Sequence, residues 1–312
     1  IVFGDWSSDV CSSDLVALGA ALVAPLLCAA AARSAADEPK VIKIHTGQRW
    51  VWYAQEDQFR AHEADYQALY EYADRAFERL VAAWGLTPAA PTYALYIWPK
   101  SGGGFATADI AEVHAITNTP QPGIGVSFDA FTGTEHGIRG WWAVAIITHE
   151  MCNLVLAQLV SHGWPVDWWA NHISPFPKMT AVQIEYDLRP DVAIEHARQL
   201  SAPLDRMFVR LKDQFGWALF RRAFTAARED GINWERIGEN PSALRTNYVA
   251  AYLQLAAPED LGPYLHGIVP AYEAQAVARI LAARREWRAL PNNDPRRTEL
   301  REAFLTGRLP PK

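Results

Sequence analysis

A run of twenty-one mostly apolar residues, with a histidine and a glutamate at its centre, constrains the fold of this chain more than any other feature. From Gly140 to about Val160 the sequence reads GWWAVAIITHEMCNLVLAQLV, which is apolar on nearly every side of a helix. Such a helix is typical of a domain interior, and Gly163 is suited to end it. The run is long enough to cross a membrane, but His149 and Glu150 at its middle argue against a span. We therefore expect a central buried helix.

The segments before this run alternate between helix and strand patterns. Residues 57–84 place apolar side chains at three- and four-residue steps, which predicts a long amphipathic helix that ends at Gly85. Residues 92–98 are rich in aromatic and aliphatic side chains and predict a strand. A glycine-rich loop follows and leads into a second expected strand around His114, and residues 123–131 predict a third.

The chain after residue 202 has an almost wholly helical pattern. The sequence therefore predicts an α+β protein, with a mixed α/β N-terminal half, the central buried helix and an all-helical C-terminal half. We expect residues 37–200 to form an α/β subdomain and residues 201–290 a helical one. Residues 291–312 are polar and proline-bearing, and they predict a loose tail.

The N-terminal region is interpreted separately from the fold. Residues 1–15 resemble a translated sequencing adapter and are set aside. Residues 16–36 combine a short apolar run with a small-residue site and predict a signal peptide; the alternatives are a membrane anchor or a lipoprotein cysteine at Cys28. We expect a secreted or periplasmic protein without a stable membrane span in the mature chain. Its single cysteine is then Cys152, so an internal disulfide is excluded.

The overall charge gives no reason to expect a nucleic-acid partner. The 312 residues carry a net charge of −6, and the arginines occur at most as isolated pairs rather than in a basic block. Thirteen tryptophans are unusual for this length. Large aromatic residues mostly fill cores, and carbohydrate stacking is the alternative use for them.

The segment ITHEMCN, residues 147–153, contains the candidate chemistry. His149 and Asn153 are four residues apart and therefore project from one face of the helix, with Glu150 beside that face. In zinc hydrolases the first and fifth residues of such a motif hold the metal, and the glutamate acts on a water molecule. The alternative is a core histidine satisfied by hydrogen bonds. However, a buried His-Glu pair is costly unless both groups have partners.

Eighteen residues separate Asn153 from His172, which lies in the segment DWWANHISPF. With these motifs, roughly residues 90–275 resemble the gluzincin metallopeptidases, the group of thermolysin and aminopeptidase N. In the aminopeptidase branch H-E-x-x-H is followed, eighteen residues later, by a glutamate that often comes after W-x-N. The resemblance implies a gluzincin-like catalytic domain with zinc held by His149, Asn153 and His172.

Two of these ligand positions depart from the family, because Asn153 replaces a histidine and His172 replaces a glutamate. The set leaves two imidazoles and one amide oxygen, so a zinc ion would be held more weakly and would keep more positive charge. Asp167 or Glu185 are candidates for a substitute carboxylate.

The resemblance also implies a tyrosine that donates to the oxyanion of a tetrahedral intermediate. Tyr248 lies at a suitable distance along the chain, and Tyr252 and Tyr186 are alternatives. For Cys152 no neighbouring base is identifiable, which favours an inert buried thiol.

These observations lead to a predicted secreted zinc metallopeptidase-like hydrolase that acts on a peptide or glycopeptide substrate, with Glu150 as general base. The alternative is a degenerate, metal-free gluzincin scaffold that binds a peptide or glycan in an aromatic-lined cleft. A purely structural protein would leave the His149–Glu150 pair unexplained. The tryptophans that would line the cleft crowd round the motif: Trp141, Trp142, Trp164, Trp168 and Trp169.

Overall fold

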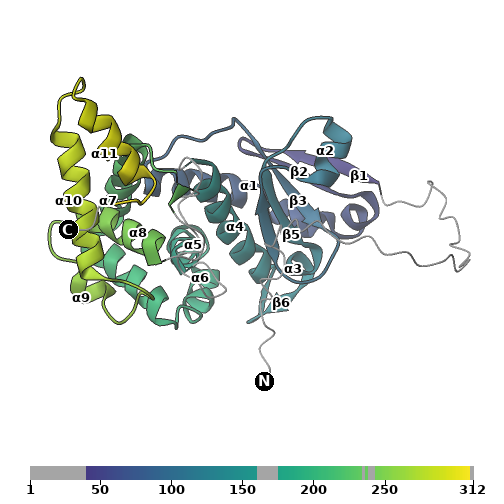
Figure 1. Ribbon diagram of the computed structural model, residues 1–312. Helices are drawn as coiled ribbons and strands as arrows, with labels where there is room; N and C mark the ends of the chain where they lie inside the picture. The colour runs from purple at the N-terminus through teal and green to yellow at the C-terminus, as the bar shows by residue number, and fades with distance from the viewer. Residues whose placement is uncertain (1–39, 160–174, 234–235, 238–242, 310–312) are drawn as a thin grey trace, which may run out of the picture.

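Two central helices separate a β-sheet from a group of C-terminal helices (Figure 1). The computed structural model describes residues 40–159, 175–233, 236–237 and 243–309. The central helices are α4 (Trp141–Leu159), which is the helix expected from the apolar run, and α5 (Pro175–Leu188). The protein is thus an α+β protein, as predicted.

The sheet has five strands in the order β1-β2-β3-β5-β4. Its three middle strands are parallel, and β1 and β4 pair antiparallel at the two edges. The expected strand at residues 92–98 is present as β3, whereas β1 and β2 were not expected. The strands are β1 (Val41–Thr46), β2 (Trp50–Gln55), β3 (Tyr93–Trp98), β4 (Gly104–Thr107) and β5 (Gly123–Ser127).

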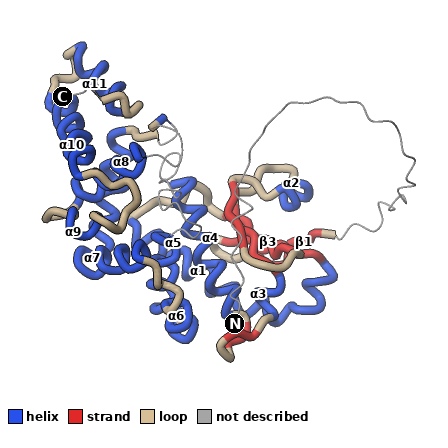
Figure 2. The backbone as a smooth tube through the Cα atoms, turned by 60° about the horizontal axis from the view of Figure 1, so that its bottom comes forward, coloured by secondary structure: helices blue, strands red, loops and turns tan. Residues whose placement is uncertain are grey.

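Alternate side chains of the sheet point to two different helical layers. Trp52 and Leu95 belong to the main core, which α1 (Glu56–Trp84), α3 (Phe128–Thr132) and α4 complete. Tyr53 and Tyr96 instead pack with Val113 of α2 (Ala111–Thr117), so α2 covers the opposite face (Figure 2). The period-two alternation of a strand produces both layers from one sequence.

One expected strand is a helix, and another is shorter than the sequence pattern indicated. The segment around His114 is helix α2 rather than a strand, and the Asp109 carboxylate, just before this helix, joins its middle to the segment that follows it. That carboxylate accepts from the backbone N–H of Gln121 at 2.9 Å and binds the His114 ring at 2.7 Å. The third expected strand ends at Ser127, where helix α3 begins. His114 therefore lies on the face of the sheet that is remote from α4.

The long amphipathic helix agrees with the prediction and is α1. Gly85 ends it in the left-handed conformation, with φ of 63°, and its N–H donates to the carbonyl of Val81. Glycine adopts this conformation without the strain that a Cβ would add.

The C-terminal half is helical, as predicted, and shares one continuous core with the sheet. No helix in the described ranges is both long and apolar enough to cross a bilayer. A short hairpin, β6 (Thr134–Glu135) and β7 (Ile138–Arg139), precedes α4. The later helices are α6 (Pro190–Ala197), α7 (Pro203–Asp230), α8 (Ala243–Ala256), α9 (Gly262–Leu265), α10 (Ala274–Ala289) and α11 (Pro295–Leu305).

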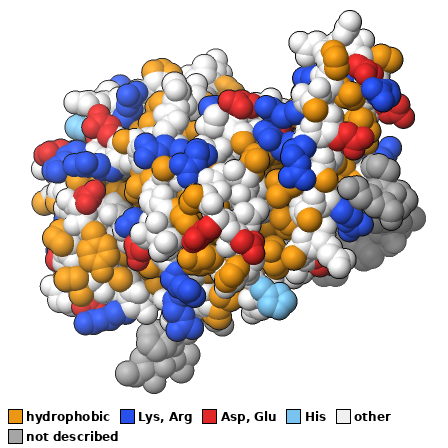
Figure 3. Space-filling view, turned by 90° about the vertical axis from the view of Figure 1, so that its left-hand side faces the viewer, with side chains coloured by type: hydrophobic (Ala, Val, Ile, Leu, Met, Phe, Trp, Pro, Cys, Tyr) orange, Lys and Arg blue, Asp and Glu red, His pale blue; other side chains and the backbone are white. Residues whose placement is uncertain are grey.

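Half of the segment that was expected to be a loose tail forms a helix, α11. Asp294 caps this helix by accepting from the N–H of Arg296 at 2.9 Å. Phe304 is fully buried, with its ring 5.4 Å from Tyr248 and 6.0 Å from Trp287. Phe304 and the neighbouring buried Leu305 thus dock a segment whose composition is polar. On this side of the molecule basic and acidic side chains are interspersed (Figure 3).

Candidate active site

Helix α4 carries the candidate site between the sheet edge and the helical half. It packs against β4 and β5 on one side and against α5 on the other. His149 and Glu150 sit at its middle and are only 8 % and 7 % exposed. The nearly uniform apolar sequence of α4 is explained by this position, since every side of the helix meets protein.

Glu150 faces the edge strand of the sheet. A Cβ placed on Gly104 of β4 would lie 3.0 Å from the Cγ of Glu150 and 2.4 Å from the side chain of Ile146. It would also lie 2.8 Å from the carbonyl oxygen of Gly125. Only glycine permits β4 to approach α4 this closely, and the approach brings the Glu150 side chain beside the strand backbone.

Burial sets the acidity of Glu150. Removal from water raises the pKa of its carboxyl group to about 7, and the Asn153 amide opposes this by donating to Oε2 at 3.1 Å. Near neutral pH the group is therefore close to half ionised. A carboxylate with this pKa can both accept and return a proton at neutral pH.

His149 is held in its neutral form. Burial, together with the positive charges of His196 and Lys178, lowers the pKa of its imidazole to about 3. These two residues belong to α6 and α5, so the charges that act on His149 come from the helical side of the site, whereas Glu150 lies beside the sheet. A neutral imidazole has a lone pair available for a metal ion.

The two polar atoms of the Asn153 side chain differ in their hydrogen bonding. Its amide nitrogen binds Glu150, whereas its Oδ1 is buried without a hydrogen-bond partner among the described residues. It lies one turn after His149, so the structure brings two of the three predicted ligands onto one face. His172, the third, lies outside the described residues. Within the described ranges no three His, Cys, Asp or Glu side chains are grouped so that they could hold a metal ion.

The predicted tyrosine lies in the C-terminal helical core. Tyr248 of α8 is fully buried, and its hydroxyl donates to the carbonyl of Phe304 at 2.6 Å. Of the alternatives, Tyr252 donates to Asp230 at 2.7 Å and Tyr186 is largely exposed on α5. Because the Tyr248 proton already has a buried acceptor, we do not include this residue in the function proposed below.

A buried polar layer behind α4 was missed by the sequence analysis. The Tyr72 hydroxyl of α1 hydrogen-bonds to Thr148. On the helical side the His196 ring binds Glu185 at 2.8 Å, both almost fully buried, and Lys178 binds Asp205 at 2.9 Å. Glu185, considered as a substitute metal ligand, is thus engaged with His196, although its Oε1 has no hydrogen-bond partner in the part of the chain described. The partners are on different helices, so no local sequence signal marks them.

The remaining sequence candidates occupy varied surroundings. Cys152 is buried and free, and burial raises the pKa of its thiol well above the usual value, as expected for an inert residue. Trp141 is almost fully buried and stacks on Trp142 at 5.1 Å, so its ring fills the core. The other candidates lie outside the described residues: Trp164, Asp167, Trp168 and Trp169.

Comparison with known proteins adds no assignment to this geometry. The sequence matches no protein-family model, and neither the curated proteins nor the solved structures contain a significant match. The distinguishing feature of the molecule is its site: a buried His-Glu pair in a central helix beside an edge strand.

Proposed function

We propose that this protein is a metal-dependent hydrolase of the gluzincin type that acts on peptides, with Glu150 as its general base. The observation that carries the proposal is the Glu150 carboxyl, whose pKa burial raises to about 7, placed next to a neutral imidazole and an edge strand. A carboxyl tuned to neutral pH in a buried position is typical of a catalytic group.

The donor set fits a zinc ion at two positions. His149 supplies a neutral imidazole, and Asn153 supplies an amide oxygen that otherwise has no partner in the described part of the chain. We propose His172 as the third ligand. When bound, the ion would polarise the substrate carbonyl and make water more acidic.

The protein's own residues would move the proton. Glu150 in its ionised form accepts a proton from the attacking water, and the resulting carboxylic acid returns it to the nitrogen of the departing amine. The Asn153 amide, 3.1 Å from Oε2, restrains the carboxyl group while it does so. At a pH below about 7 the carboxyl is mostly protonated, so hydrolysis should rise as the pH increases through this value.

The edge strand supports an extended peptide as the substrate. Strand β4 pairs with β5 on one side and is the last strand of the sheet, so its outer N–H and C=O groups face no further strand in the described part of the chain. Such an edge can add a peptide strand by backbone hydrogen bonds. The Cβ positions of Gly102 and Gly103 meet no atom within 4 Å, which leaves room before the strand.

A second candidate function is favoured by the Asn153–Glu150 hydrogen bond. In the metal-free alternative the amide satisfies the buried carboxyl, and α4 with β4 forms a scaffold that binds a peptide or glycan without hydrolysing it. The absence of a three-ligand group among the described residues is compatible with this alternative.

Metal analysis of the purified chain separates the two candidates. We expect stoichiometric zinc that is lost in His172→Ala. A fully folded protein without metal, even after incubation with zinc, would remove the hydrolase proposal.

Glu150→Gln tests the base directly. Loss of a general base should lower hydrolysis of a peptide library by about 10²- to 10⁴-fold while the zinc content stays unchanged. The matched control is Glu71→Gln, at an exposed position of α1, which should leave both quantities unaltered. Full activity of Glu150→Gln would show that the proposed role is wrong.

A further inference from the structure

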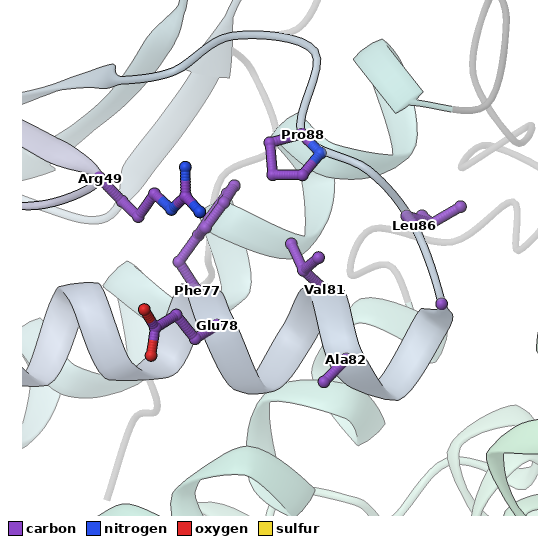
Figure 4. Close-up of a pocket in the computed structure, with 8 residues that line it drawn as sticks. Arg49, Phe77, Glu78, Val81, Ala82, Leu86 and Pro88 are labelled. Carbon is purple, nitrogen blue, oxygen red and sulfur yellow. The ribbon is translucent and has the colours of Figure 1, made fainter.

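A concave site lies at the opposite end of the sheet from Glu150. It is a pocket of about 300 Å³ where the end of α1 meets the start of β2 (Figure 4). At this end of the sheet the N–H of Tyr93, the first residue of β3, donates to the carbonyl of Arg49. Gly104, which lies beside Glu150, pairs with Val126 near the other end of the strands. The lining residues are Arg49, Phe77, Glu78, Val81, Ala82, Gly85, Leu86 and Pro88.

The floor of this pocket is apolar and firmly held. Phe77 is fully buried, with its ring 5.7 Å from Trp50 and 5.3 Å from Tyr93. Val81 and Pro88 stand beside it (Figure 4). An apolar group of suitable size would leave water on entering this space.

Arg49 provides a fixed positive charge at the rim. Its backbone is held from two sides, since its N–H donates to Asp74 Oδ1 at 2.8 Å and its carbonyl accepts from Tyr93 at 2.8 Å. The guanidinium makes one long hydrogen bond, from Nη1 to the carbonyl of Pro91 at 3.4 Å. Within the described ranges no carboxylate lies at ion-pair distance from it, so its remaining donors can serve a ligand.

Glu78 places the opposite charge on the same rim. Figure 4 shows its carboxylate and the Arg49 guanidinium on one side of Phe77, with Val81, Leu86 and Pro88 on the other. Glu78 also has no ion-pair partner among the residues described. A simple organic anion would be attracted by Arg49 and repelled by Glu78, whereas a zwitterion would complement both.

We propose that this pocket binds a free α-amino acid with an aliphatic or aromatic side chain. The ligand carboxylate pairs with Arg49, its ammonium group with Glu78, and its side chain lies against Val81 and Pro88, beside the buried Phe77 ring. This inference is independent of the hydrolase proposal, because it uses none of the residues of α4.

Titration calorimetry of the full chain with L-leucine and L-phenylalanine tests the pocket. We expect millimolar binding or tighter, with 4-methylpentanoate and isopentylamine each at least about tenfold weaker, since each lacks one charge-assisted contact. Equal binding of leucine and 4-methylpentanoate would overturn the role of Glu78 and with it the proposed ligand class.

Variants place the binding in this pocket. Arg49→Gln and Glu78→Gln should each weaken leucine binding by about tenfold or more, while Arg75→Gln, an exposed change on the same helix, should not alter it. Ala82→Trp should block the pocket from an exposed position of α1. The proposal is overturned if leucine fails to bind the unmodified protein at millimolar concentration. Pairing of Arg49 with Glu78 in solution would have this result. The proposal is also overturned if Arg49→Gln and Ala82→Trp both bind leucine normally.

Discussion

Two buried carboxyl groups, Glu150 in α4 and Asp230 at the end of α7, have very different surroundings. Asp230 is fully buried and accepts from Arg284 Nε at 2.5 Å, from Arg288 Nε at 2.7 Å and from the Tyr252 hydroxyl at 2.7 Å. Glu150 instead accepts from the neutral Asn153 amide of the same helix at 3.1 Å, and burial raises the pKa of its carboxyl group.

The difference shows two ways in which a fold uses a carboxyl group. Asp230 joins α7 to α8 and α10, and two guanidinium groups compensate the loss of its hydration. Such a network is typical of structure. Among the described residues Glu150 has no cationic partner of this kind, and burial raises the pKa of its carboxyl group into the neutral range. Groups left in this condition cluster at functional sites.

Asp230→Ala should have the largest effect on stability. It leaves Arg284 and Arg288 without their buried partner, and breaking a buried ion pair in this way costs about 3–5 kcal/mol. Urea unfolding followed by circular dichroism measures the loss. The control is Asp213→Ala, on the same helix and largely exposed, which should change stability by less than about 0.5 kcal/mol. Equal effects of the two variants would break the comparison.

Glu150→Gln should increase stability, and only at higher pH. The pKa of Glu150 is raised from 4.5 to about 7 in the folded protein, so its contribution is complete below pH 4.5 and is lost as the pH rises through about 7. Glutamine does not titrate, so above pH 8 the variant should exceed the unmodified protein by on the order of 3 kcal/mol.

The measurement is urea unfolding of chelator-treated protein at pH 5 and pH 8.5. The His149 contribution is common to both proteins and cancels in the difference. A gap that does not grow between the two pH values would mean that Glu150 is compensated as fully as Asp230.

Asn153→His should have the smallest effect of the three variants in free energy, and the effect should be specific to zinc binding. It replaces an amide oxygen by an imidazole at the fifth motif position, and it removes the hydrogen bond to Glu150. Zinc affinity, measured by competition with a chelator, should rise by about tenfold or more. If the unmodified chain binds no zinc and the variant does, the metal-free scaffold becomes the better account.

Much of the fold could be predicted because it follows local patterns. The period of apolar residues identified α1 and α4, and Gly85 marked the end of α1. The helix around His114 could not be predicted, because Asp109 holds His114 and Gln121 through contacts that no local periodicity records. Helix α11 was not expected for a related reason: two buried residues, Phe304 and Leu305, outweigh a polar composition.

The candidate site divides in the same way. The four-residue spacing of His149 and Asn153 placed both residues on one helical face, as observed. The position of Glu150 beside that face was predicted from its adjacency to His149. The approach of β4 at Gly104 was not visible, since it depends on the sheet order. Nor did the sequence reveal that the Tyr248 hydroxyl would donate a hydrogen bond to the carbonyl of Phe304, fifty-six residues away.

The sequence by itself determined that a helix apolar on all sides carries an ionisable pair, because both properties are written in one contiguous segment. Only the tertiary structure decided what surrounds each member of that pair. Glu150 meets an edge strand and His149 meets the charges of α5 and α6 because those elements return to α4 from distant parts of the chain. Acidity depends on burial and on neighbouring charges in space, and neither quantity has a fixed separation along the sequence.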